Sequence, residues 1–178
     1  MTTPDENGQL PLHRALCDNA TITFGSIKLL VKGNPSAVRC PDNTGRTPLH
    51  VACQHYETPA IIDYLIGLDS IAFRATDFEH NTALHLACRG AKHDTITLLL
   101  EKYGGTSISK RNAHNQLPIH LLLESNEVSD KDDSKFLESI YRLLRAYPET
   151  VIDLKEEFNF EPESCLSPNG KKRKFGAN

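Results

Sequence analysis

The chain has 178 residues, of which 39% are hydrophobic and 24% charged, so we expect a soluble folded protein of one domain or one short repeat array. Its net charge of -3 argues against nonspecific nucleic-acid binding by the whole body. No run of 18 apolar residues is present, and the first ten residues lack the basic start and apolar core of a secretory signal. We therefore expect an intracellular protein with no membrane span.

One short sequence pattern recurs four times along the chain. Its copies read GQLPLHRALC, GRTPLHVAC, HNTALHLAC and NQLPIHLLL, and they place a histidine at His13, His50, His85 and His120. The spacings between these histidines are 37, 35 and 35 residues. A fixed period of this length predicts a stacked repeat architecture, in which each unit buries its apolar side against the next.

The pattern TPLH followed by AC, at this period, resembles the ankyrin repeat, and the resemblance runs from about residue 5 to residue 153. It implies an all-α fold, an α-solenoid of stacked helix-turn-helix repeats with β-hairpin-like finger loops. We place an N-terminal lead at 1–4 and the repeat domain at 5–160. Its repeats span about 5–41, 42–76, 77–111 and 112–150, with a partial fifth at 151–160. Residues 161–178 are expected to be a disordered polar tail.

Each repeat opens with a turn that two aligned rows of residues predict. Eight residues before the histidine stand Asp5, Asp42, Asp77 and Asn112, whose side chains can accept backbone hydrogen bonds across a tight turn. Five residues before it stand Gly8, Gly45, His80 and Asn115. Glycine adopts a positive φ freely, and Asn and His are among the residues enriched there, so this row predicts one left-handed backbone position.

The first helix of each repeat follows that turn. Thr47 and Thr82 can cap two of these helices, whereas Leu10 and Leu117 replace threonine in the outer repeats and remove both the side-chain cap and the threonine-to-histidine contact typical of the family. We expect weaker or differently satisfied helix ends there. Three cysteines recur near the histidines, and we interpret them as small core residues in a reducing compartment: Cys17, Cys53 and Cys88.

The second helix of each repeat carries apolar residues at i, i+3 and i+4, which predicts one apolar stripe per helix. The stripes are Ile27, Leu30 and Val31; Ile61, Tyr64 and Leu65; Ile96, Leu99 and Leu100; and Ile140, Leu143 and Leu144. In the segments between repeats, Val38, Phe73 and Ile108 share one aligned position and are expected to point inward. The fourth repeat carries an acidic insert at 124–135, which we expect to be a solvated loop or a frayed helix start.

The histidines and cysteines also invite metal and catalytic hypotheses. Stacked helices lie roughly 8–10 Å apart, so one histidine per repeat cannot converge on a zinc ion with bonds of about 2 Å. We interpret the four repeating histidines as structural and expect no cofactor or metal. His50 and Cys53 share one helical face, as do His85 and Cys88, but an active site is usually singular and no orienting acid is evident. We expect no enzyme activity.

Two basic features suggest binding. Arg39 and Arg74 are 35 residues apart and therefore expected on corresponding finger tips, where Lys110 and Arg111 extend the row. Such a row can pair with carboxylates or phosphates of a partner segment, or it can be a solvated edge that keeps the protein soluble. The tail contains Lys171, Lys172, Arg173 and Lys174, a run that suits either nuclear import or a plain solvated tail.

The resemblance implies noncatalytic recognition of another protein through finger tips and inner helices, in an adaptor, scaffold or regulatory role. We expect a monomer whose partner has an acidic segment. The alternative is a nuclear or nucleic-acid-associated factor directed by the basic tail. A further rival is a fragment of an enzyme subunit or inhibitor whose chemistry lies in another domain.

Overall fold

The computed structural model describes residues 3–17, 22–55, 58–104, 107–125 and 133–151. Residues 1–147 form one compact unit, and a second unit begins at Pro148, of which only residues 148–151 are described. In the described part of the chain, no helix is long and apolar enough to cross a membrane. The partial fifth repeat beyond residue 151, most of the insert at 124–135 and the basic tail lie outside the described residues.

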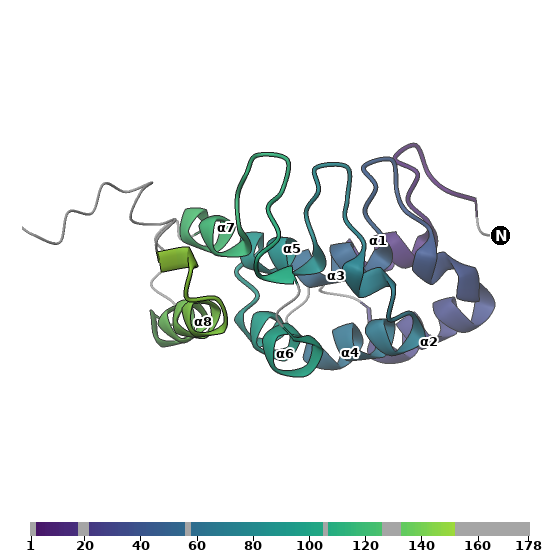
Figure 1. The fold of residues 1–178 in the computed structure, drawn as a ribbon. Helices are drawn as coiled ribbons and strands as arrows, with labels where there is room; N and C mark the ends of the chain where they lie inside the picture. The colour runs from purple at the N-terminus through teal and green to yellow at the C-terminus, as the bar shows by residue number, and fades with distance from the viewer. Residues whose placement is uncertain (1–2, 18–21, 56–57, 105–106, 126–132, 152–178) are drawn as a thin grey trace, which may run out of the picture. The chain divides into compact units, whose positions relative to one another are not determined.

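The first unit consists of four successive pairs of helices (Figure 1). The pairs are α1 (Pro11–Cys17) with α2 (Phe24–Gly33), α3 (Pro48–His55) with α4 (Pro59–Leu68), α5 (Ala83–Arg89) with α6 (His93–Tyr103), and α7 (Pro118–Glu124) with α8 (Asp133–Ala146). The first helices of the pairs (α1, α3, α5 and α7) pack side by side in one layer, and α4, α6 and α8 pack side by side in the other (Figure 1). This arrangement confirms the predicted all-α repeat solenoid. We call α1, α3, α5 and α7 the inner helices and the others the outer helices.

A finger loop precedes each inner helix, and the second, third and fourth fingers connect an outer helix to the next inner helix (Figure 1). The first two outer helices lead into short 3-10 helices, η1 (Pro35–Arg39) and η2 (Ala72–Arg74), before the chain rises into the finger. The fingers are hairpin-like: within the described residues their only ladder pairing is an isolated bridge between Thr76 and Thr82.

The turn at each finger tip has the chemistry that the sequence predicts. In the second finger Oδ1 of Asp42 accepts hydrogen bonds from the backbone N–H groups of Thr44 at 2.8 Å and Arg46 at 3.0 Å. Asp5, Asp77 and Asn112 make the same pair of backbone contacts in their own turns. The left-handed row is confirmed as well, with φ of 72°, 80°, 61° and 62° at Gly8, Gly45, His80 and Asn115.

The core lies between the two helix layers and is built from the predicted stripes. Ile27, Ile61, Ile96 and Leu143 are buried, as are the inward-pointing Val38, Phe73 and Ile108 of the finger bases. Apolar area removed from water stabilises such a stack by about 25 cal/mol per Å². Each stripe is covered only when a neighbouring repeat packs against it, which is why the helix pairs depend on one another.

The expectation for one of the three cysteines was wrong. Cys53 and Cys88 are buried in the core, but Cys17 is exposed. Cys17 stands four residues after its histidine rather than three, and the core position in that repeat is filled by Leu16, which is fully buried. One residue turns a helix by about 100°, so this shift moves the thiol off the buried face.

The repeating histidines join each repeat to the next. Nδ1 of the imidazole accepts the backbone N–H three residues earlier, with N···N distances of 3.2, 3.2, 3.2 and 2.8 Å for His13, His50, His85 and His120. Because Nδ1 is an acceptor, Nε2 carries the hydrogen. In the first three repeats Nε2 donates it to a carbonyl of the following finger, at 3.2 Å in each case: Arg46, Ala75 and Gln116.

Candidate functional site

The fingers stand side by side because their backbones bond to one another (Figure 1). The N–H of Asn43 donates to the carbonyl of Asn7 at 3.0 Å, that of Phe78 to Thr44 at 3.0 Å, and that of Ala113 to Glu79 at 2.8 Å. These contacts run from each finger to the one before it. The four tips therefore form a continuous, preorganised edge, which lowers the entropy lost when a partner binds.

Gly45 shows how close this approach is. A Cβ on Gly45 would lie 2.5 Å from Cδ1 of Phe78 and 2.9 Å from the Phe78 backbone nitrogen. The residue therefore needs to be glycine for two reasons, its φ of 80° and the contact with the next finger.

Phe78 is the most distinctive group on the tip edge. It stands seven residues before its histidine, where the other fingers carry Glu6, Asn43 and Ala113. Its side chain is 73% exposed, although one edge of the ring rests against Gly45. Aromatic residues that project from a rigid support contribute strongly to protein interfaces. Phe78 was not predicted from the sequence, and the signal for it was one aromatic residue in a row of otherwise polar or small residues.

A second surface lies where the fingers meet the last turns of the inner helices, and we call it the inner face. In the second and fourth repeats it pairs the residue four positions before the histidine with the residue four positions after it. Nη1 of Arg46 lies 3.5 Å from Oε1 of Gln54, and Nε2 of Gln116 donates to Oε1 of Glu124 at 2.6 Å. In the repeat between them Arg89 forms an ion pair with Glu79 at 3.5 Å.

The inner face is therefore polar and of mixed sign. Ion pairs with partly exposed partners are worth at most about 1 kcal/mol each, so they can be exchanged for contacts with a bound protein at little loss. The face has the chemistry of an interface rim rather than of a reactive centre.

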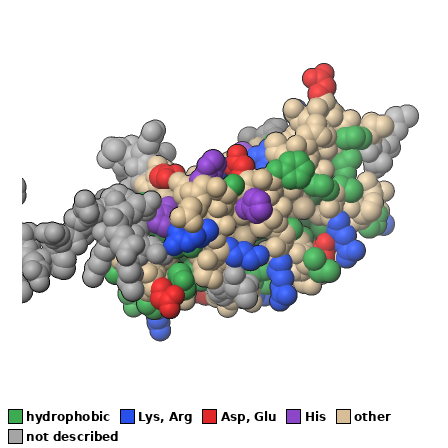
Figure 2. Space-filling model, turned by 45° about the horizontal axis from the view of Figure 1, so that its top comes forward, with side chains coloured by type: hydrophobic (Ala, Val, Ile, Leu, Met, Phe, Trp, Pro, Cys, Tyr) green, Lys and Arg blue, Asp and Glu red, His purple; other side chains and the backbone are tan. Residues whose placement is uncertain are grey.

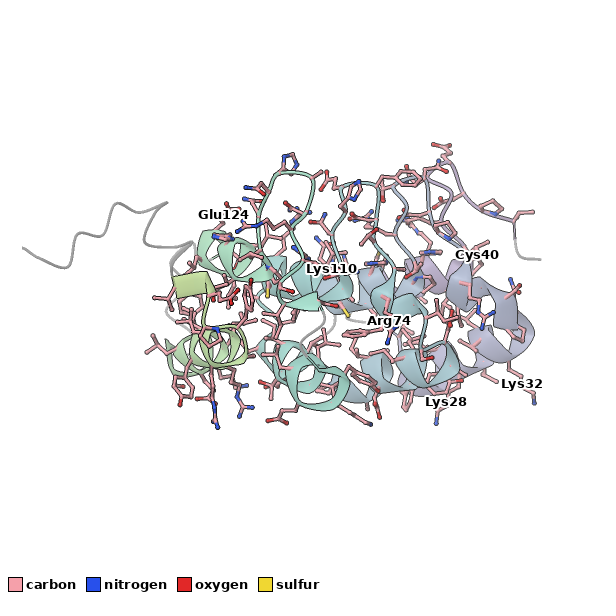
Figure 3. All side chains as sticks on the ribbon, viewed as in Figure 1. Lys28, Lys32, Cys40, Arg74, Lys110 and Glu124 are labelled. Atoms are coloured by element: carbon pink, nitrogen blue, oxygen red, sulfur yellow. The ribbon has the colours of Figure 1, made fainter. Side chains whose placement is uncertain are left out.

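The basic row lies at the bases of the fingers, and the predicted position at the tips was wrong. Arg39 ends η1 and Arg74 ends η2, so both stand at finger bases and not at the tips. Lys110 likewise lies at the base of its finger, as Figure 3 shows together with Arg74. The shared 35-residue spacing correctly put Arg39 and Arg74 at corresponding places, but it did not say how far up the finger they stand.

The members of this row have different local roles. Nε of Arg39 lies 2.9 Å from the carboxylate of Asp69, a buried residue at the end of α4, so this pair ties the first repeat to the second. Arg111 donates from Nη1 to the carbonyl of Asn115 at 2.8 Å. Arg74 and Lys110 are exposed and form no ion pair with any other described residue.

The buried histidines of the first three repeats and the buried thiols of Cys53 and Cys88 are held in unreactive forms. Burial lowers the pKa of His13, His50 and His85, and it brings the pKa of His85 to about 4, so these imidazoles are neutral at pH 7. Burial raises the pKa of the Cys53 and Cys88 thiols far above its usual range, which keeps them protonated and non-nucleophilic. Among the described residues, no group of three or more His, Cys, Asp or Glu side chains is arranged to hold a metal ion.

Comparison with known proteins identifies the repeat. A family model described as ankyrin repeats, three copies, matches residues 1–71 and 20–112. Similar proteins include a probable serine/threonine-protein kinase of Dictyostelium discoideum, 27% identical over 70% of this chain and 15% of its own length. They also include the B-cell lymphoma 3 protein homolog of Mus musculus, 28% identical over 70% of this chain and 28% of its own length.

A third relative is the NF-kappa-B inhibitor zeta of Homo sapiens, 31% identical over 54% of this chain and 14% of its own length. The chain thus spans less than a third of the length of each of these relatives.

Proposed function

The chain belongs to the ankyrin repeat family, and on that premise we propose that it is a noncatalytic module that binds another protein through its finger tips and inner face. Ankyrin repeats imply protein–protein interaction. The relatives named as an NF-kappa-B inhibitor and a B-cell lymphoma 3 homolog favour a regulatory adaptor among the possible roles. We expect it to act inside the cell.

The observation that carries the proposal is the exposed ring of Phe78 on a rigid edge. A side chain that is 73% exposed but fixed at its base loses little freedom when it enters a pocket on a partner. The polar groups of the inner face lie beside it on the same fingers and can supply hydrogen bonds around this apolar anchor. An aromatic anchor surrounded by polar contacts is the usual distribution of binding energy in an interface.

The noncatalytic part of the proposal rests on the chemistry of the buried groups. The neutral imidazoles of His13, His50 and His85 use both ring nitrogens in structural hydrogen bonds, and the buried thiols stay protonated. Neither group is placed to act as a base or a nucleophile on a substrate.

Quantitative affinity capture from native cell extract tests the proposal. Wild type is compared with Phe78→Ala and with Leu29→Ala, which removes a similarly exposed apolar side chain (70% exposed) from the outer helix α2. Proteins captured by wild type and by Leu29→Ala, but depleted about tenfold or more with Phe78→Ala, are the expected result. Equal capture by all three proteins would refute the role of the tips.

A nuclear role is the second candidate, and the sequence run Lys171, Lys172, Arg173 and Lys174 is the observation that favours it. Imaging of a tagged protein in which these four residues are alanine decides the point. The same distribution as wild type would dismiss an import signal. Salt-dependent binding of nucleic acid that vanishes with the run would support a nucleic-acid-associated factor instead.

A further inference from the structure

A hollow of about 360 Å³ lies at the junction of the first and second repeats. Val31 of α2, Val38 of η1 and Leu68 at the end of α4 give it apolar walls, and the Arg39–Asp69 ion pair lies at its edge. Leu68 is 43% exposed, and Ile71, whose N–H donates to Asp69 at 3.1 Å, is 71% exposed. Exposed apolar side chains therefore continue from the hollow onto the surrounding surface.

The basic row begins at this hollow and continues along the repeats. Arg39 at its edge is balanced by Asp69, whereas Arg74 one repeat on and Lys110 two repeats on have no ion-pair partner among the described residues. The nearby carboxylate of Asp63 is already taken up by Lys102 and Tyr103. Figure 2 shows both Lys and Arg and Asp and Glu side chains on this side of the molecule. The positive charge available to a ligand is therefore that of Arg74 and Lys110, which no other described residue neutralises.

The spacing of these features sets the form of a ligand. Neighbouring helices of a stack lie about 8–10 Å apart, and an extended chain advances about 3.3 Å per residue. One repeat therefore corresponds to about three residues of an extended peptide. A peptide that seats a side chain in the hollow brings its residues three and six positions away opposite Arg74 and Lys110.

We propose that this surface binds an extended acidic segment of a partner protein, with one bulky apolar residue in the hollow and acidic residues three and six positions from it. The inference rests on the proposed function, since it assumes a protein partner, but it uses a surface distinct from Phe78 and the inner face. A protein segment fits better than a nucleic-acid strand because the hollow offers apolar walls and the chain carries a net charge of -3.

Fluorescence anisotropy with labelled synthetic peptides tests this inference. The probe has one Leu, Asp residues three and six positions after it, and Ser and Gly elsewhere. It is compared with the reversed sequence and with a peptide of the same composition in which the Asp residues adjoin the Leu. The spaced peptide, in at least one direction, is expected to bind at least about fivefold more tightly than the adjoining one.

Single charge reversals locate the site. Arg74→Glu and Lys110→Glu should each weaken the spaced peptide about fivefold or more, whereas Arg145→Glu, on the exposed face of α8, should change it less than about twofold. Ser36→Trp fills the hollow from an exposed position and should remove the advantage of Leu over Ser in the probe. Equal effects at residues 74 and 145, equal binding of spaced and adjoining peptides, or tighter binding of a single-stranded oligonucleotide would overturn the inference.

Phe78→Ala separates the two proposals. It should bind the spaced peptide as wild type does. If the peptide fails to bind while capture from extract still depends on Phe78, the inference about the hollow is wrong and the proposed function stands. If capture is indifferent to Phe78 while the peptide binds as expected, the finger tips are the part of the proposed function that is wrong.

Discussion

The two central repeats and the two outer repeats start their inner helices differently, yet they arrive at the same geometry. In the central pair the hydroxyls of Thr47 and Thr82 lie 2.9 Å from Nδ1 of His50 and His85. In the outer pair leucine takes the place of threonine, and the backbone N–H of Leu10 or Leu117 still donates to the histidine. The imidazole is thus the common connector, and the threonine hydroxyl is an addition to it.

In the two outer repeats, the starts of the inner helices are also stabilised by burial. Leu10 and Leu117 are buried, Leu117 almost completely, so each adds apolar contact where it gives up a hydrogen bond. The start of each inner helix must therefore pair one backbone N–H with the histidine and fill the space beside it. Threonine fills that space with a hydroxyl that contacts the histidine, and leucine fills it with buried apolar contact.

Removal of a central histidine should have the largest effect. His85→Ala leaves the N–H of Thr82 and the carbonyl of Gln116 without their partner and opens a cavity in a fully buried site. We expect a loss of about 3–4 kcal/mol in the free energy of unfolding by urea. His13→Ala should cost less, since its imidazole has no threonine hydroxyl to lose. Equal losses at the two positions would mean that the threonine contact contributes nothing.

Acid should weaken the stack in a defined window. The pKa of His85 is about 4 in the folded chain, against an ordinary value of 6.5, so between these values the unfolded chain binds a proton that the folded chain does not. Stability should therefore fall by about 3 kcal/mol as pH drops from 6.5 to 4, with smaller losses from His13 and His50 in the same direction. Urea midpoints measured across pH 4–8 check this. A flat profile would contradict it.

Two of the aligned residues with positive φ, Gly45 and His80, allow a matched pair of substitutions. Gly45→Ala places a Cβ against the Phe78 backbone at a φ of 80°, and we expect it to cost about 2 kcal/mol. His80→Ala keeps a Cβ that the finger already accommodates at a φ of 61°, so its cost should stay below about 1 kcal/mol. Thermal unfolding of the two variants measures the difference. A larger loss at residue 80 would count against the close packing of the fingers.

Loss of a threonine hydroxyl should have a small effect. Thr82→Val preserves the shape of the side chain but removes the contacts with Nδ1 and the N–H of His85, so we expect a loss of about 1 kcal/mol. Leu117→Thr supplies the missing hydroxyl but gives up buried apolar area, and it should destabilise the protein rather than stabilise it. An increase in stability from Leu117→Thr would show that the leucine is a defect of the outer repeat.

The features that recur in every repeat could be predicted from the sequence, because the same position can be compared across four aligned copies. Asp42 and Gly45 were recognisable as turn residues since three aligned copies have the same backbone demand. The same reasoning misplaced Cys17, because alignment by residue type ignored the one-residue shift that puts Leu16 in the core.

Features that occur once were harder to predict. Phe78 gave no periodic signal, and its exposure depends on the close contact between the third finger and Gly45 of the second. The role of Arg39 depends on Asp69, a contact 30 residues away that no local pattern encodes. The height of the basic row on the fingers likewise depends on the 3-10 turns, which spacing alone does not reveal.

Hydrogen–deuterium exchange of the chain, with and without the protein that affinity capture identifies, tests the central claim most directly. The claim is that recognition takes place on the fingers and inner face while the outer helices serve as support. It predicts that the partner slows exchange at the finger tips, residues 42–45, 77–80 and 112–115, and leaves α6 and α8 unchanged. Protection confined to the outer helices, with no change in the fingers, would contradict it.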